Sequence, residues 1–307
     1  MQATRKEFII ALDEGTTNAK AVVLDSRGQV VVKFSQPLAI QTPREGWVEQ
    51  SGEVLVDASL AVIAQAVAHI GAENVAALAI SNQRETAIGW YRQSGKPINA
   101  AITWQCSRSA AFCDELRHSD KERQIKAVTG LPIAPLFSAS KMRWLLESLP
   151  EGRALAERGE ICLGTIDSWL LWNLTGGAEG DAGREALHAT DVTNASRTLL
   201  MDIEKLEWDE ELCKEMGIPM SMLPEIRPSL GDFRTVRERG SLSGVPIRAI
   251  LGDQQSAMFG QGCFRAGSAK NTYGTGLFLL LNTGTTPKFS ENGLLTTVCY
   301  KIGDRPT

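Results

Sequence analysis

The stretch Phe8-Ile9-Ile10-Ala11-Leu12-Asp13-Glu14-Gly15-Thr16-Thr17 decides the fold that we predict. Its five leading apolar residues form a continuous run, which is typical of a buried β-strand. The run ends in a carboxylate and is followed by a Gly-Thr-Thr turn. Further strands are predicted over 19–25 and 29–36, separated by the turn Ser26-Arg27-Gly28. The pattern predicts a β-meander whose first turn presents backbone N–H groups and hydroxyls.

Strand and helix patterns along the rest of the chain predict the α/β class, with a mixed sheet flanked by helices. Helices are expected from Ser51-Gly52-Glu53 to about His69, and over 109–116, 121–128, 138–149, 168–174 and 209–216. Strands over 75–81, 86–91 and 101–104 are expected to continue the first sheet. A strand over 247–251 leads into a helix ending near Cys263. Strands over 269–271, 277–281 and 294–300 are expected to begin a second sheet, and the glycine-rich segment 176–183 is expected to be a surface loop.

Composition sets the broad class of the protein. The 307 residues suit one large domain or two smaller ones. The net charge of −4, together with basic residues that are scattered along the sequence, argues against nucleic acid as a partner. We found no N-terminal signal segment and no apolar run of about 20 residues, so we expect a cytoplasmic protein without membrane insertion.

The cysteines carry no metal or disulfide pattern. They are Cys106, Cys113, Cys162, Cys213, Cys263 and Cys299. No two of them have the CxxC spacing, and the three histidines form no ligand pair with them. We therefore expect free thiols in a reducing compartment.

The loop that follows the first strand has the residue types that hold phosphate. Asp13 can hold Mg²⁺ through water, Gly15 lets the backbone approach a phosphate, and threonine hydroxyls add donors. The alternative is an ordinary hairpin turn, because Asp, Gly and Thr all favour turns. The chain has no Walker A motif, since Gly95-Lys96 is followed by Pro97. A nucleotide would therefore have to be held by another kind of loop.

Two further motifs have the chemistry of a polyol pocket. In Gln83-Arg84-Glu85, the charged pair can donate to and accept from vicinal hydroxyls, although a surface ion pair is the alternative. Trp104 follows a predicted strand and can pack on the carbon backbone of a polyol. The alternative for Trp104, one of seven tryptophans, is a place in the core, and Phe278 has the same ambiguity.

Two motifs near the C-terminus complete the pattern. Asp253 in Gly252-Asp253-Gln254-Gln255 can take the proton from a hydroxyl, and Gln254 can help to hold that hydroxyl. The alternative for Asp253 is a helix N-cap. Gly274-Thr275-Gly276 can contact a terminal phosphate, or it can be a tight hairpin turn.

In this order, the motifs resemble the glycerol kinases of the FGGY carbohydrate kinase family, which have the actin-like ATPase (ribonuclease H-like) fold. The resemblance extends along nearly all 307 residues and includes Gly46-Trp47-Val48-Glu49-Gln50 and the segment 291–297. It implies ATP-dependent phosphorylation of glycerol to sn-glycerol 3-phosphate, with ATP and Mg²⁺ as cofactors. It also implies an N-terminal domain over 1–255 and an incomplete start of a second domain over 256–307.

The resemblance assigns a role to each candidate residue. It makes Asp253 the general base and surrounds glycerol with Arg84, Glu85, Trp104, Asp253, Gln254 and Phe278. The implied nucleotide contacts are Asp13, Thr16, Thr17, Lys20 and Thr275, with Asp13 beside the metal. Self-association into a homo-oligomer is left open.

The sequence departs from the family pattern at several places. Leu136 stands where glycerol kinases carry a tyrosine that touches the substrate, and Lys20 replaces an arginine near the nucleotide. Glu14 replaces a glutamine and adds negative charge near phosphate, and the loop around 176–188 is longer than usual. The chain is also shorter than the family's usual length, so we expect it to be weakly active or inactive alone.

Three alternatives remain open at the level of sequence. The first is an FGGY kinase for another polyol or sugar, which Leu136 favours. The second is a non-catalytic polyol-binding remnant, although the presence of Asp253, Arg84 and Glu85 argues against it. The third, an actin-like ATPase or chaperone, leaves Trp104 and the segment 82–85 without a role.

Overall fold

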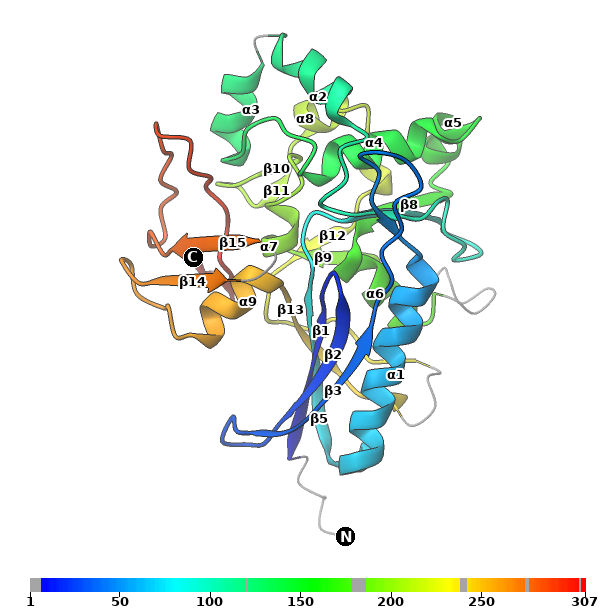
Figure 1. Ribbon diagram of the computed structural model, residues 1–307, viewed down its shortest axis with the longest axis vertical. Coiled ribbons are helices and arrows are strands. Elements are labelled where there is room, and N and C mark those ends of the chain that lie inside the picture. The colour runs from blue at the N-terminus through cyan, green and yellow to red at the C-terminus, as the bar shows by residue number, and fades with distance from the viewer. Residues whose placement is uncertain (1–6, 120, 178–185, 238–241, 274–275, 304) are drawn as a thin grey trace.

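A five-stranded mixed sheet forms the centre of the molecule. The computed structural model describes residues 7–119, 121–177, 186–237, 242–273, 276–303 and 305–307. The strands run in the order β13-β5-β1-β2-β3 (Figure 1). Their bounds are β1 (Phe8–Glu14), β2 (Asn18–Leu24), β3 (Val30–Pro37), β5 (Val75–Asn82) and β13 (Ile247–Gly252).

Strand direction explains why this sheet carries a site. β1, β2 and β3 form the predicted antiparallel meander, whereas β5 is parallel to β1 and β13 is parallel to β5. In this register Glu14 and Gly252 both lie opposite Asn82, at the carboxyl ends of the three parallel strands. Ligands of α/β sheets bind outside such ends. The strand order and directions confirm the predicted actin-like fold.

Helix α1 (Gly52–Ile70) covers one face of the central sheet. Its N-cap is Ser51, whose Oγ accepts from the backbone N of Val54 at 3.3 Å. Contrary to the sequence expectation, α1 is long and apolar enough to cross a membrane by length and composition. However, 44% of its apolar window is buried and the helix packs against β1, β2 and β3, as a core helix does.

A separate four-stranded sheet combines one short strand from before β5 with three strands from after it. Its order is β4-β7-β6-β8, with bounds β4 (Glu49–Gln50), β6 (Ala87–Tyr91), β7 (Ala101–Ile102) and β8 (Ile161–Thr165). The prediction that 86–91 and 101–104 continue the first sheet is therefore wrong. Between β5 and β6 the chain turns at Glu85, whose φ of 64° lies in the left-handed region and redirects the backbone.

Helices and short strands surround this second sheet. The predicted helices are present as α2 (Ala110–Arg117), α3 (Glu122–Thr129), α4 (Ser138–Glu147), α6 (Ile166–Leu174) and α8 (Glu210–Glu215), while α5 (Gly152–Glu157) and α7 (Val192–Ala195) were not predicted. The short pairs are β9 (Ala189–Asp191) with β12 (Glu225–Arg227) and β10 (Met201–Asp202) with β11 (Glu207–Trp208). Residues 178–183 of the predicted surface loop lie outside the described residues. All six cysteines are buried and unpaired.

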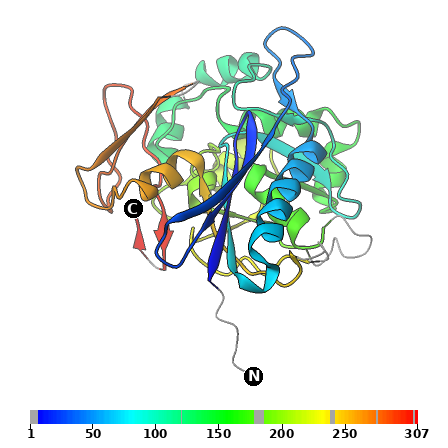
Figure 2. The same ribbon diagram turned by 60° about the horizontal axis from the view of Figure 1, so that its bottom comes forward.

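The last part of the chain begins with α9 (Asp253–Gly260) and the hairpin of β14 (Ala269–Tyr273) and β15 (Leu277–Leu281). Both lie on the side of the central sheet away from α1 (Figure 2). The strand predicted over 294–300 is wrong, since no residue of that described segment belongs to a strand. Its backbone instead donates to Gly130 O from Thr296 and to Ser196 Oγ from Val298. Only the short pair β16 (Lys301–Ile302) and β17 (Arg305–Pro306) follows.

A buried carboxylate links the second sheet to the central core. Asp167, at the start of α6, accepts hydrogen bonds from Thr165 Oγ1 at 2.5 Å and Thr190 Oγ1 at 2.6 Å. Its side chain is fully buried, and this burial raises its pKa to about 7. The ionised form of Asp167 therefore opposes folding at neutral and alkaline pH.

We predict that Asp167→Asn changes how stability depends on pH. The folded pKa exceeds the unfolded one, so the stability that Asp167 contributes is fully present below about pH 4 and is lost as the pH rises through about 7. Between about pH 4 and pH 7, the free energy of unfolding of the wild type should fall by up to roughly 1.4 kcal/mol per pH unit relative to that of the variant. Urea unfolding at about pH 5 and about pH 8 measures this difference. Asp57→Asn on the exposed face of α1 is the control, and parallel pH curves for wild type and Asp167→Asn would contradict the prediction.

Candidate active site

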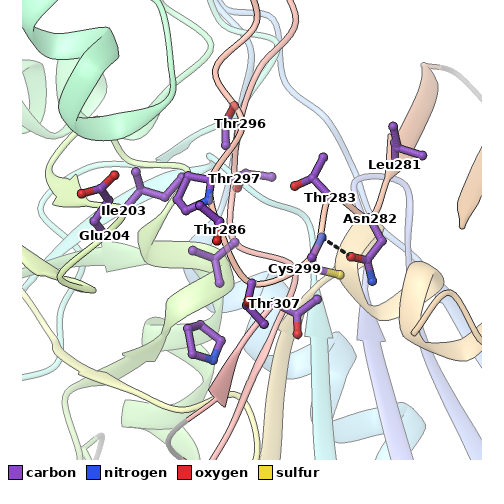
Figure 3. A pocket seen from close by; sticks show the side chains of 15 residues that line it. Ile203, Glu204, Leu281, Asn282, Thr283, Thr286, Thr296, Thr297, Cys299 and Thr307 are labelled. Atoms are coloured by element: carbon purple, nitrogen blue, oxygen red, sulfur yellow. Dashed lines mark hydrogen bonds between the residues drawn. The ribbon is translucent and has the colours of Figure 1, made fainter. Parts of the chain in front are cut away.

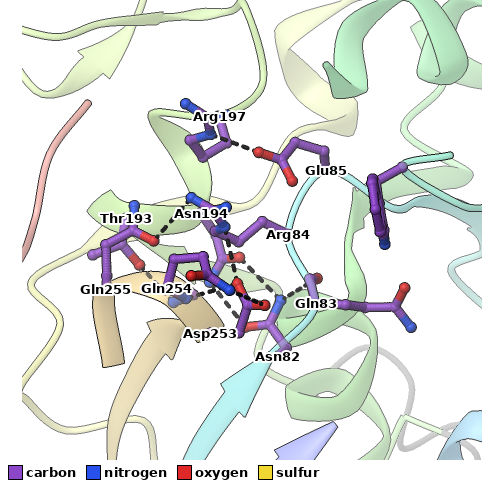
Figure 4. A network of polar contacts seen from close by, with 12 residues as sticks. Asn82, Gln83, Arg84, Glu85, Thr193, Asn194, Arg197, Asp253, Gln254 and Gln255 are labelled. Atoms are coloured by element: carbon purple, nitrogen blue, oxygen red, sulfur yellow. Dashed lines mark hydrogen bonds and ion pairs between the residues drawn. The ribbon is translucent and has the colours of Figure 1, made fainter. Parts of the chain in front are cut away.

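The centre of the site is an ion pair between the ends of two parallel strands. Arg84 follows β5 and Asp253 follows β13, and Arg84 Nε donates to Asp253 Oδ1 at 3.0 Å (Figure 4). Arg84 Nη1 also donates to Gln255 Oε1 at 3.3 Å. The Arg84 side chain is 5% exposed and that of Asp253 is 36% exposed. A fixed guanidinium thus holds a carboxylate that solvent and a ligand can reach.

Asp253 is held by its own helix as well. The N-cap of α9 is Gly252 and not Asp253, which is the first helical residue, so the N-cap alternative is wrong. Asp253 Oδ1 accepts from the backbone N of Gln254 at 2.7 Å, and Oδ2 accepts from Gln254 Nε2 at 3.0 Å. Together with Arg84, three N–H donors therefore fix the orientation of this carboxylate.

Glu85 belongs to a second, buried ion pair. Arg197 Nε donates to Glu85 Oε1 at 2.6 Å, and both side chains are 6% exposed. Burial raises the pKa of Glu85, but the positive charges of Arg84 and Arg197 outweigh burial and bring that pKa below its ordinary value. Glu85 is therefore an anionic acceptor, and the surface-pair alternative for Arg84 and Glu85 is wrong. Sequence analysis gave Arg197 no role, because only the fold brings it to Glu85.

Two aromatic side chains line the same site. Trp104 is partly exposed, and its ring lies 6.4 Å from that of Phe278, centroid to centroid, in an edge-to-face arrangement. Arg84 Cζ lies 5.7 Å from the centroid of Phe278. Trp104 Nε1 donates to Thr16 Oγ1 at 2.9 Å. Trp104 is thus not a core residue, and it lies with Phe278 and Arg84 as expected of an amphipathic pocket.

The loop after β1 places its polar groups beside Asp253. Asp13 and Lys20 are opposite each other in the sheet, and Lys20 Nζ lies 3.5 Å from Asp13 Oδ2. Burial raises the pKa of Asp13, the charge of Lys20 lowers it, and the nearby charge of Asp253 raises it further. Thr17 is exposed and Thr16 is engaged by Trp104. Thr275 lies outside the described residues.

Glu14 contributes less negative charge than its sequence position suggested. Its side chain points from β1 into the core, opposite to that of Asp13, and it is fully buried. Gln83 Nε2 is its hydrogen-bond partner, 3.4 Å from both carboxylate oxygens. Burial raises the pKa of Glu14 well above its ordinary value, which favours the neutral form.

A buried polar network joins the segments 82–85 and 193–197 behind the site. Asn82 and Asn194 exchange side-chain hydrogen bonds at 3.0 and 3.1 Å. Thr193 Oγ1 accepts from the backbone N of Gly252 at 2.8 Å and donates to Asp191 Oδ1 at 2.8 Å. The network therefore fixes the carboxyl ends of β5 and β13 to α7 (Figure 4).

A cavity of about 280 Å³ lies apart from this site, between the β10–β11 turn and the last residues of the chain (Figure 3). Its walls include Ile203, Glu204, Asn282, Thr297 and Thr307. None of the described site residues lines it. The cavity is therefore separate from the candidate site at the strand ends.

The fold and the arrangement of acid, base and aromatic groups define a carbohydrate-kinase class of protein. Residues 8–260 match the N-terminal domain of the FGGY family of carbohydrate kinases, and the chain belongs to this family. It is 50% identical over 301 residues to the glycerol kinase of Corynebacterium kroppenstedtii and 49% identical over 296 residues to that of Corynebacterium glutamicum. These alignments cover 97% and 96% of this chain and 58% of each relative.

Solved structures agree with the family. Glycerol kinase from Plasmodium falciparum, solved with ADP, superposes with a TM-score of 0.90 at 36% identity, covering 97% of this chain and 59% of that one. Xylulose kinase from Lactobacillus acidophilus gives a TM-score of 0.83 at 21% identity, covering 97% and 58%, and supports the fold alone. The chain thus spans somewhat less than three fifths of the length of these relatives.

We predict that Gly252→Ala displaces Arg84. A Cβ at Gly252 would lie 2.6 Å from Arg84 Cδ, 2.7 Å from Arg84 Cγ and 3.0 Å from Gln255 Oε1. Such crowding should cost about 1–3 kcal/mol of stability and weaken the ion pair with Asp253. Thermal unfolding and the Nε–H NMR signal of Arg84 measure the two effects.

Gly260→Ala is the matched control for that experiment. Gly260 ends the same helix, and a Cβ there would meet nothing within 4 Å. It should be neutral or stabilising, because alanine favours a helix over glycine. If Gly252→Ala and Gly260→Ala had the same Tm and the same Arg84 Nε–H signal, the position of Arg84 would not depend on the missing side chain at Gly252.

Proposed function

We propose that this chain carries the polyol-binding and base-supplying part of an ATP-dependent glycerol kinase, which forms sn-glycerol 3-phosphate. The main support is the geometry of Asp253, an accessible carboxylate held by Arg84 and Gln254 between an aromatic wall and the Asp13 loop. The names of relatives that are about half identical to the chain support glycerol as the substrate.

In this proposal each side chain has one task. Asp253 takes the proton from a terminal hydroxyl of glycerol, so that the oxygen can attack the transferred phosphorus. The anionic Glu85 accepts and the cationic Arg84 donates hydrogen bonds to the hydroxyls, while Gln254 helps to orient them. Trp104 and Phe278 pack on the carbon backbone and exclude water from the reacting groups.

The residues after β1 fit a magnesium–nucleotide complex. Asp13 is partly exposed at a strand end, and carboxylates are ligands that Mg²⁺ accepts directly or through water. Thr17 and Lys20 are exposed on the same loop and strand and can donate to phosphate. When bound, the complex supplies the phosphoryl group and neutralises its charge. Thr16 and Thr275 are proposed to complete this side of the site.

The organisation of the whole protein follows the same proposal. Residues 1–255 form the domain that binds polyol and phosphate, and 256–307 begin a second domain. We propose a cytoplasmic location, with glycerol and ATP as the small-molecule partners. Size-exclusion chromatography with light scattering decides between a monomer and a homo-oligomer.

Turnover of ATP to ADP by the purified chain tests the proposal, with glycerol compared against other polyols and ketoses. We predict that Asp253→Asn lowers turnover by about a hundredfold or more. Glycerol binding should stay nearly intact, because the amide keeps the shape of the carboxylate. Calorimetric titration with glycerol measures binding. Parallel loss of binding and turnover would make Asp253 a binding or structural residue.

A kinase for another polyol is the second candidate, and Leu136 is the observation that favours it. The segment with Leu136 lies beside the site, since Ser138 Oγ donates to Glu85 O at 3.2 Å and Lys141 Nζ donates to the Leu136 carbonyl at 2.5 Å. An apolar side chain at this place offers no hydrogen bond to a hydroxyl.

We predict that Leu136→Tyr strengthens glycerol binding by about twofold to tenfold, the worth of one hydrogen bond. Leu136→Phe is the matched control, because it adds the ring without the hydroxyl. Calorimetry on the three proteins separates the two contributions. If Leu136→Tyr weakens glycerol binding while the wild type turns over a different polyol, that polyol becomes the substrate.

A further inference from the structure

Lys270 is a buried cation beside the site, and the proposed function gives it no task. It lies on β14 and is 2% exposed. Its Nζ donates to Gln254 Oε1 and to Thr272 Oγ1, the latter at 2.8 Å. Lys270 and Thr272 share one face of the hairpin, since alternate residues of a strand point to the same side. That face is directed at α9 and the reacting groups.

The contact with Lys270 determines which way the Gln254 amide points. An ammonium group has three donors and no acceptor, so the atom that faces Lys270 must be the amide oxygen. The NH₂ group of Gln254 then faces Asp253, where Nε2 lies 3.0 Å from Oδ2. If the amide turned over, its oxygen would lie against the carboxylate of Asp253 and repel it.

We propose that Lys270 is a positioning residue for phosphoryl transfer, which fixes the Gln254 amide so that its NH₂ group holds Asp253 in the orientation that accepts the proton. This inference rests on the proposed function and assigns a further residue to the same site. Among the described residues the hydrogen bonds of Lys270 go to Gln254 and Thr272, so it acts on Asp253 through Gln254. The hairpin that carries it thereby connects residues beyond 255 to the base.

Charges around Lys270 agree with this task. Burial and then the positive charge of Arg84 lower its pKa, while the charge of Asp253 raises it, and Cys263 and Cys299 also face it. A buried cation is costly unless it has partners. Two hydrogen bonds and a nearby carboxylate supply them here, whereas a purely apolar side chain would fill the same space without fixing the amide.

The test is a double-mutant cycle between Lys270→Met and Gln254→Met, measured as glycerol-dependent turnover. Lys270→Met alone should lower kcat about tenfold, the effect of one misdirected hydrogen bond. In the Gln254→Met background it should have almost no further effect, because the group that it orients is gone. Additive losses would mean that Lys270 only stabilises the hairpin, and would overturn the proposal. Lys33→Met, on the exposed part of β3, controls for the loss of one positive charge.

A second measurement does not depend on activity. The side-chain NH₂ signal of Gln254, identified by its absence in Gln254→Met, should exchange slowly with water in the substrate-free wild type and quickly in Lys270→Met. No binding of glycerol to the wild type together with this change would reject the proposed function, while the orientation of the Gln254 amide by Lys270 would stand. Turnover with an unchanged signal in Lys270→Met would reject the inference and keep the function.

A second substitution tests the proposal in case Lys270→Met is too unstable to fold. If Lys270→Met does not fold, Lys270→Gln replaces it, because glutamine fills the site but can both donate and accept. It therefore leaves the Gln254 amide free to turn. The same loss of turnover, dependent on Gln254, is expected, and wild-type turnover in Lys270→Gln would overturn the proposal.

Discussion

The contact between Arg84 and Asp253 is the interaction on which the rest of the site depends. It joins residues 169 positions apart in the chain, and parallel pairing of β5 with β13 brings them together. Gly252 is required beneath it, because the stem of Arg84 crosses the space that any side chain there would occupy. Hydrogen bonds from Asn82 to Asn194 and from Gly252 to Thr193 then fix the ends of β5 and β13 to α7. The pairing of β5 with β13 in the central sheet therefore sets the position of Asp253.

The charged side chains of the site form ion pairs, and these pairs allow the carboxylates of Asp13 and Asp253 to lie close together. The charge of Asp253 raises the pKa of Asp13 and the charge of Lys20 lowers it, while Arg84 pairs with Asp253. Glu85 has Arg197 as its hydrogen-bonded partner, and the charge of Arg84 adds to the stabilisation of its anionic form. In the described structure Asp13, Asp253 and Glu85 therefore each have a cationic partner, which is Lys20, Arg84 and Arg197 respectively.

Local patterns predicted much of this arrangement, and long-range pairing accounts for the rest. The strands of the meander and most helices follow from apolar runs and turn residues, so 8–37 and 52–70 agree with the expected elements. The left-handed conformation of Glu85, which sends the chain into a different sheet, has no local signal because Glu rarely adopts it. Arg197 and Lys270 likewise become site residues only through tertiary contacts with Glu85 and Gln254. The segment 294–300 looked like a strand by its composition, but its backbone bonds to loops and side chains instead.

The geometry separates the segment around Leu136 from the groups that hold Asp253. Donors to Asp253 come from Arg84, from the first turn of α9 and, through Gln254, from the β14 hairpin. The segment of Leu136 reaches the site by another route, through Ser138 and the backbone of Glu85. No described hydrogen bond joins Leu136 to Asp253 or Gln254, and the side chain of Leu136 packs against the hydrophobic core around α4 and β8. A change of side chain at Leu136 therefore leaves the hydrogen bonds that orient Asp253 in place.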